Sequence, residues 1–147
     1  MSLPEDAPPV LIVQHMPEHF TKAFAERINM FSKITVKEAA HGDRVESGHA
    51  YIAHGGRQLA CVEKNGDCYL AVVDDPPMNR FKPSVDYLFQ SVLELDLSSE
   101  VLAIILTGMG SDGAKGLLAL KNRGAYTIGQ SEESCLVYGM PRAANEI

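Results

Sequence analysis

Two short segments of the sequence combine residue types that could carry out acid–base chemistry on an ester or amide. His15 lies in Gln14-His15-Met16-Pro17, directly after the continuously apolar run at residues 10–13. An imidazole at this place can take and return a proton near neutral pH. Asp112 lies in the segment Thr-Gly-Met-Gly-Ser-Asp-Gly at residues 107–113, where a carboxylate could orient the imidazole. These residues are candidates for two members of a hydrolase triad.

Both segments also have an ordinary structural explanation. A single histidine after a strand is commonly a solvated loop residue, and Asp112 could be the N-cap of the helix that follows it. The glycines at 108, 110 and 113 allow the backbone to approach a ligand and to point N–H groups at a developing negative charge. A glycine-rich turn from strand to helix is a weak signal when it stands alone.

The sequence offers no clear nucleophile to complete a triad. Its serines at 84, 111, 131 and 134 lie outside any Gly-x-Ser-x-Gly elbow, and Ser84 is predicted to cap a helix. The cysteines at 61, 68 and 135 have no metal-type spacing and are odd in number, so we interpret them as reduced thiols. A metal-dependent hydrolase that uses His15 and His19 is a competing hypothesis, which the intervening Pro17 weakens.

The elements that must position these residues alternate between strand and helix. Apolar runs predict strands at residues 10–13, 34–38, 50–53, 59–63, 68–73, 101–106 and 125–128. Helical spacing predicts helices over residues 20–31, 84–93 and 114–123 and a last one from Met140-Pro141. Asn65-Gly66 predicts a hairpin turn, and Gly124 a helix C-cap. The fold class is therefore α/β: doubly wound, with a mainly parallel sheet, helices on both faces and one β-hairpin.

Composition narrows the possible partners. The 147 residues (16.0 kDa) carry a net charge of −6 and have a pI near 5.3, which argues against nucleic acid or an anionic membrane surface. No apolar run approaches the roughly 20 residues of a membrane span. We expect a cytoplasmic protein with no membrane insertion. Residues 1–9 are interpreted as a linker or expression remnant, and residues 10–147 as the folded domain.

Five blocks of sequence, in this order, resemble the catalytic domain of the chemotaxis-receptor methylesterases, the CheB family. They are residues 14–27, residues 48–53, residues 76–86 beginning Pro-Pro-Met-Asn-Arg, residues 106–113, and Tyr138-Gly139-Met140-Pro141. The resemblance implies a cofactor-free protein-glutamate methylesterase. Such an enzyme hydrolyses methyl-glutamate esters on bacterial chemoreceptors, releases methanol, and often deamidates receptor glutamines.

The resemblance also implies roles for individual residues. His15 is similar to the catalytic histidine, Asp112 to the aspartate that orients it, and Met109, with Gly110 beside it, to the oxyanion-binding segment. Arg80 lies in a block expected on the substrate side. The partners implied are the cytoplasmic domain of a methylated chemoreceptor and, in the full-length parent, a receiver domain.

The sequence departs from the family pattern in ways that shape these expectations. The family's Ser-Thr-Gly-Gly nucleophile segment precedes the histidine strand, and this chain does not contain it; His54 and Gln58 stand where the family usually has proline and histidine. We therefore expect a partial catalytic domain that lacks its first strand and its end and is inactive alone. The alternative is a non-catalytic receptor-binding module of the same fold. A missing neighbour strand would leave residues 10–13 as an apolar edge, which predicts self-association, strand exchange or a rearranged sheet.

Overall fold

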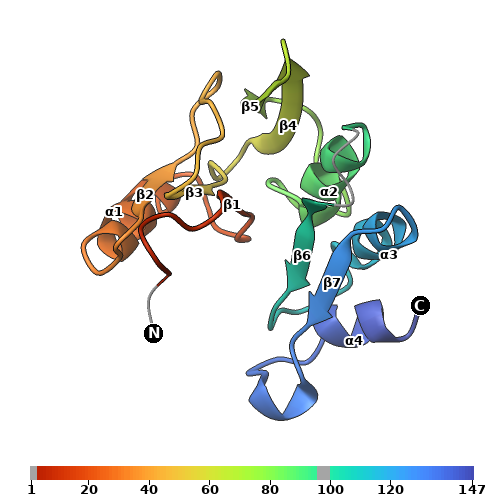
Figure 1. Ribbon diagram of the computed structural model, residues 1–147. Helices are drawn as coiled ribbons and strands as arrows, with labels where there is room; N and C mark the ends of the chain where they lie inside the picture. The colour runs from red at the N-terminus through yellow and green to blue at the C-terminus, as the bar shows by residue number, and fades with distance from the viewer. Residues whose placement is uncertain (1–2, 96–99) are drawn as a thin grey trace. The chain divides into compact units, whose positions relative to one another are not determined.

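The computed structural model describes residues 3–95 and 100–147, and the chain divides into two units, residues 1–84 and 85–147 (Figure 1). In each unit a helix connects two strands of a parallel sheet, and all strand pairs except one hairpin are parallel. This arrangement is the α/β class that the sequence predicts. No described helix is long and apolar enough to cross a membrane.

The first unit is built on a small parallel sheet. Strands β1 (Val10–Ile12), β2 (Thr35–Glu38) and β3 (His49–Ile52) are ordered β1-β3-β2, so the half-buried β1 forms one edge of this sheet. Helix α1 (Thr21–Asn29) connects β1 to β2. The core between helix and sheet joins buried residues from the strands, α1 and the N-terminal segment: Ala7, Ala25, Ile34, Val36, Ala50 and Ile52, with Val10, Ile12, Phe24 and Ile28 packed against them.

The face that α1 buries agrees only in part with the one predicted. Apolar residues recur at helical spacing from Phe20 to Phe31, and of these Phe24 and Ile28 pack against the core. Phe20 and Phe31 are 59% and 81% exposed, and Ala23 is exposed too. The helix begins after Phe20 and ends at Asn29, so neither aromatic ring lies within it. Thr21 and Ala25 are buried beside Phe24 and Ile28, so these four residues form the packed face.

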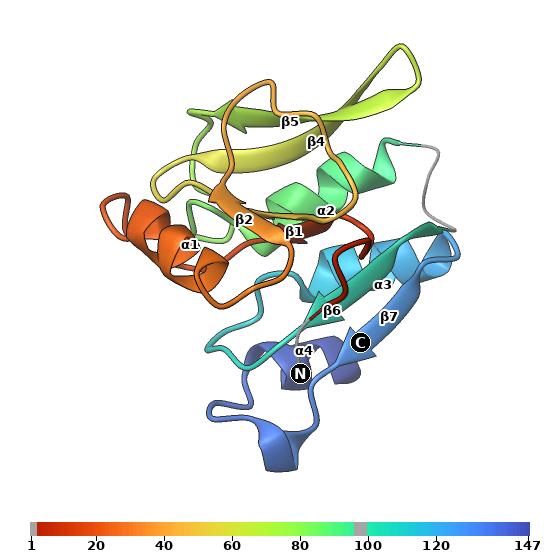
Figure 2. The same ribbon diagram turned by 60° about the vertical axis from the view of Figure 1, so that its left-hand side comes forward.

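The second sheet of this unit is the predicted hairpin. Strands β4 (Gln58–Lys64) and β5 (Asp67–Val73) pair antiparallel and lie side by side in Figure 2. Asn65 and Gly66 both have positive φ angles, 56° and 84°, as a two-residue type I′ turn requires. The Asn-Gly prediction is confirmed.

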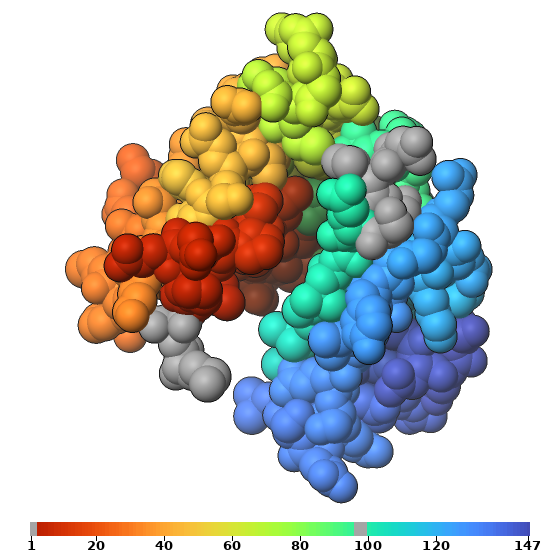
Figure 3. Space-filling view, in the orientation of Figure 1, coloured from red at the N-terminus to blue at the C-terminus, as the bar shows by residue number. Residues whose placement is uncertain are grey.

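The second unit contains a strand–helix–strand arrangement. Strands β6 (Leu102–Ile105) and β7 (Tyr126–Gly129) pair in parallel through helix α3 (Ala114–Asn122). Helix α2 (Val85–Leu93) precedes them, and the 3-10 helix η2 (Glu132–Ser134) and helix α4 (Met140–Asn145) follow. Ala103 and Ile105 of β6 are buried, whereas the alternate residues Leu102 and Ile104 face outward; both strands are visible at the surface of this unit in Figure 3.

Two predicted helix boundaries are confirmed here. Gly124, with a φ of 96°, follows the C-cap of α3, and the N–H of Ala125 returns to the carbonyl of Leu120 at 3.0 Å. Such a left-handed glycine satisfies carbonyls that the helix end leaves open. Helix α4 has Pro141 in its first turn, where a missing N–H costs nothing.

Candidate active site

His15 lies just beyond the carboxyl end of β1 and is held by an aromatic stack. Its imidazole and the ring of Phe81 are parallel within 5°, with ring centroids 3.8 Å apart. The histidine is half-buried rather than fully solvated. A stacked ring fixes the plane in which the two imidazole nitrogens can act, so the contact orients the candidate base. Nothing in the spacing of the sequence pointed to Phe81.

Phe81 belongs to a tight turn that also carries Arg80. Met78 and Phe81 exchange backbone hydrogen bonds of 3.1 and 2.8 Å, and the central residues Asn79 and Arg80 have φ angles of 53° and 72°. This is a two-residue hairpin turn built without glycine at the position that favours it most. An arginine in the left-handed region costs on the order of 1 kcal/mol, and such strain clusters at functional sites. The turn presents Arg80 to solvent.

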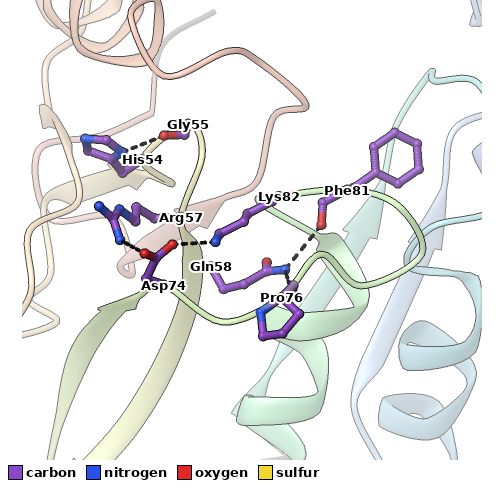
Figure 4. A network of polar contacts seen from close by, with 8 residues as sticks. All are labelled: His54, Gly55, Arg57, Gln58, Asp74, Pro76, Phe81 and Lys82. Carbon is purple, nitrogen blue, oxygen red and sulfur yellow. Dashed lines mark hydrogen bonds and ion pairs between the residues drawn. The ribbon is translucent and has the colours of Figure 1, made fainter.

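Gln58, at the start of β4, ties this loop to the hairpin (Figure 4). Its side chain is completely buried. Its Nε2 donates to the carbonyls of Pro76 (3.1 Å) and Phe81 (3.2 Å), and its Oε1 accepts the N–H of Ser84 (2.9 Å). One side chain therefore satisfies backbone groups at both ends of the loop. The glutamine that departs from the family pattern has a structural task, which its type and spacing did not indicate.

An ion-pair network closes the same loop from outside. The carboxylate of Asp74 contacts Lys82 at 2.5 Å and Arg57 at 2.7 Å, as Figure 4 shows. The hydrogen bond from Lys82, together with the positive charges of Arg57 and Lys82, holds the pKa of Asp74 below its usual value. The ion pair between Asp74 and Lys82 therefore joins the two residues that flank segment 75–81. His54 lies nearby in sequence, and its Nδ1 is 2.7 Å from the carbonyl of Gly55.

Thr21 and Gly55 connect the segment between β1 and α1 to the loop after β3. Thr21 is completely buried; its hydroxyl donates to the carboxylate of Glu38 and accepts the N–H of Gly55 at 3.1 Å. A Cβ on Gly55 would come within 2.6 Å of the backbone of Pro17 and Glu18. The loop after β3 thus packs directly against the segment that follows His15. Only glycine allows so close an approach.

Asp112 caps a different helix from the one that follows it in the sequence. Its side chain, 1% exposed, accepts the N–H of Val85 at Oδ2 (2.7 Å) and the N–H of Asp86 at Oδ1 (3.3 Å). It therefore caps α2, not the following helix α3, whose N-cap is Gly113 without a side-chain cap. This carboxylate thus binds the N–H groups of the first two residues of α2. The reason is tertiary, because the two helix N-termini are brought together.

A second carboxylate, on α2, binds the N-terminus of α3 in return. Asp86, buried in the first turn of α2, accepts the N–H of Gly116 in the first turn of α3 at 2.7 Å. Both aspartates lie at helix N-termini, where unpaired N–H groups and the helix dipole favour negative charge. Cβ atoms on Gly113 and Gly116 would approach Val85 and Phe89 to 2.5 and 2.7 Å. The glycines let the helix starts pack closely enough for this exchange.

The backbone around Met109 and Gly110 is shaped by the segment before α4. The carbonyl of Gly108 accepts the N–H groups of Gly139 and Met140, at 3.1 and 2.8 Å. A Cβ on Gly139 would lie 2.6 Å from that carbonyl and 3.0 Å from the nitrogen of Gly110. Met109 itself is 80% exposed. Within residues 3–95 and 100–147, the N–H groups of Met109 and Gly110 donate no hydrogen bond.

The predicted site residues fall into two groups. His15 and Arg80 belong to the first unit, where Phe81 links their segments; Asp112, Met109 and Gly110 share one loop of the second unit. The pairing of His15 with Asp112 stays a prediction. His15 and His19 both precede α1, so they do not share a helix face. Among the described residues, no group of three or more His, Cys, Asp or Glu side chains is arranged to hold a metal ion.

Comparison with known proteins identifies a matching family and several relatives of the chain. The family model described as CheB methylesterase matches residues 1–147. Two relatives named protein-glutamate methylesterase/protein-glutamine glutaminase, from Photorhabdus laumondii and Paraburkholderia xenovorans, are 52% and 54% identical to it over 97% of its length. The matched region spans 40% and 39% of the length of these two relatives, respectively.

A solved structure agrees with the sequence comparison. The catalytic domain of the Thermotoga maritima CheB methylesterase matches 98% of this chain with a TM-score of 0.94 and 39% identity, and 76% of that domain is covered. The α/β fold is thereby confirmed. The chain belongs to the CheB methylesterase family.

Proposed function

We propose that the protein to which this chain belongs hydrolyses methyl-glutamate esters on bacterial chemoreceptors, releases methanol, and deamidates receptor glutamines. The observation that carries the proposal is the match of the CheB methylesterase model to all 147 residues, with relatives of both named activities at 52% and 54% identity. A cytoplasmic location and a receiver domain in the parent protein are part of the same proposal.

In the proposed mechanism Asp112 orients His15 and His15 moves the proton. The two amides of α2 take one lone pair on each oxygen of Asp112, which leaves the carboxylate fixed in direction but still able to accept from an imidazole N–H. A carboxylate held in this way sets the tautomer of the histidine and stabilises the imidazolium. The Phe81 stack supplies the second constraint on the imidazole ring.

The segment at Met109 and Gly110 is proposed to bind the oxyanion. Its N–H groups make no hydrogen bond to the described part of the chain, and Gly110 has a φ of 93° with open space where a Cβ would be. Backbone N–H groups aimed at the developing negative charge of an ester carbonyl lower the barrier of acyl transfer. Arg80, exposed on its strained turn, is proposed to contact an acidic group of the receptor beside the ester.

The nucleophile requires a separate proposal. The printed sequence contains no Ser-Thr-Gly-Gly segment. We propose that a serine outside these 147 residues attacks the ester carbonyl, that His15 transfers its proton to the departing methanol, and that water cleaves the acyl-enzyme. The mechanism uses no metal or organic cofactor. The 147-residue chain alone should then release methanol from methylated receptor at least about 1000-fold more slowly than an intact relative.

Histidine variants of the full-length protein test these roles. His15→Gln should lower methanol release from methylated receptor at least about 1000-fold, whereas His41→Gln, at an exposed loop position, should leave it unchanged. His19→Gln separates the metal-dependent alternative, which requires an equally large loss there. Activity of His15→Gln within tenfold of the wild-type enzyme would contradict the proposed mechanism.

The non-catalytic alternative makes the opposite prediction. If the protein is a receptor-binding module, His15→Gln should retain its affinity for receptor. The wild-type full-length protein should then release no methanol either. Methanol measurement and a receptor pull-down on the same preparations therefore distinguish the enzyme from the binding module.

A further inference from the structure

Two cysteines lie on the same face of the β4–β5 hairpin. In the register of this pair Cys61 faces Leu70 and Glu63 faces Cys68. Alternate residues of a strand share a face, so Cys61 and Cys68 are diagonal neighbours, displaced by one such step toward the turn. The right-handed twist of antiparallel strands shortens one of the two diagonals of each pair. The two thiols therefore project from the same face of the hairpin, close enough for Cys68 to affect the pKa of Cys61.

The backbone around the pair is held from both sides. Beyond the bonds to β4, the carbonyl of Cys68 accepts the N–H of Val45 at 2.9 Å, and Leu70 exchanges bonds of 2.8 Å with Gly42 and Asp43. Strand β5 therefore has bonded neighbours on both edges near Cys68. This support keeps the two thiols together without a covalent bond between them.

The thiols differ in their access to solvent. Cys61 is 6% exposed, while Cys68 is half-buried. Desolvation, followed by the proximity of Cys68 and the hydrogen bond with it, raises the pKa of the Cys61 thiol to about 12. Because oxidants attack the accessible thiol first, Cys68 is the position where the chemistry begins.

We propose that Cys61 and Cys68 form an oxidant-inducible disulfide across the β4–β5 hairpin, a modification site separate from the esterase chemistry. The oxidant is a peroxide. One hydrogen peroxide converts the Cys68 thiol to a sulfenic acid and is itself reduced to water. The Cys61 sulfur then attacks the Cys68 sulfur; the S–S bond forms, the S–O bond breaks, and the hydroxyl leaves as water with the Cys61 proton. Two thiol hydrogens and one peroxide thus give one disulfide and two waters.

The third cysteine provides a matched control. Cys135 belongs to the other unit and directs its thiol to the carbonyl of Gln130 at 3.9 Å. A general sensitivity of thiols to peroxide would affect Cys135 as readily as Cys68, since both are half-buried. The proposal requires that only the hairpin pair be joined.

The test is intact and peptide mass spectrometry of the 147-residue chain after treatment with dilute hydrogen peroxide. The expected product is a monomer that has lost two hydrogens, with its peptides linked through Cys61 and Cys68 and separated by dithiothreitol. Thiol titration after denaturation should fall from three groups to one. Cys68→Ser and Cys61→Ser should abolish the linkage, and Cys135→Ser should retain it.

Other products would overturn the proposal. They are a linkage that includes Cys135, addition of oxygen to Cys68 without loss of two hydrogens, or three thiols that survive a treatment that oxidises free glutathione completely. Because Cys61 is buried, the Cys68→Ser variant is the primary control, and circular dichroism of each variant confirms that the comparison is made on folded protein.

Discussion

Replacing Gln58 by leucine removes a side chain that bonds both ends of the loop at residues 76–84, while it keeps a side chain of similar volume in a completely buried position. The substitution leaves three backbone groups without this partner: the carbonyls of Pro76 and Phe81 and the N–H of Ser84. The bond to the Ser84 N–H is buried and the two bonds to carbonyls are partly buried. A hydrogen bond contributes about 1 kcal/mol net, so losing all three costs about 3 kcal/mol.

Urea unfolding of the 147-residue chain, followed by far-ultraviolet circular dichroism, measures this cost. With a slope of about 2 kcal/mol per molar urea, a loss of about 3 kcal/mol lowers the unfolding midpoint by about 1.5 M. Gln90→Leu is the matched control, because Gln90 is exposed on α2, and its change should stay within about 0.5 kcal/mol. Equal midpoints for the two variants would refute the reasoning that Gln58 satisfies these groups.

Amide hydrogen exchange measures which part of the chain loses protection in this variant. The N–H groups of Phe81 and Ser84 should lose more protection in Gln58→Leu than those at the centre of β3, whose protection falls only with the global stability. A uniform acceleration through the first unit, with none specific to the loop, would show that the glutamine acts on packing rather than on the loop.

Two further predictions follow from the helix starts and from the ion pairs. Gly113→Ala should destabilise the protein by about 2–3 kcal/mol, because its φ of 89° disfavours a side chain and the new methyl would lie 2.5 Å from Val85. The control Gly42→Ala has a similar φ of 86° but open space around the new methyl, so it should cost about 1 kcal/mol. Equal losses of stability in thermal unfolding of the two variants would contradict this account. The lowered pKa of Asp74 means that its ion pairs stabilise the fold above the usual pKa of 3.8 and that this contribution disappears as pH falls through the folded-state value. In Lys82→Met the carboxyl of Asp74 should titrate at higher pH by NMR, and an unchanged midpoint would show that Lys82 does not hold it.

Local patterns of the sequence were enough for several elements of the fold. Apolar runs located β1 and β6, Asn65-Gly66 located the hairpin turn, and Gly124 located the end of α3. These features depend on steric limits of single residues or on burial of a continuous run, which act over a few positions and do not require the rest of the chain. The family resemblance rested on such local blocks, and the comparisons confirm it.

The tertiary structure decided the partners of the candidate site residues. Asp112 caps a helix that begins 27 positions earlier in the chain, and His15 stacks on Phe81. Gln58 satisfies groups of a loop that follows the hairpin, and the buried face of α1 is set by where the helix starts and ends. Periodicity and spacing do not encode such contacts, because they depend on which segments the folded backbone brings together and on which buried polar groups then need a partner.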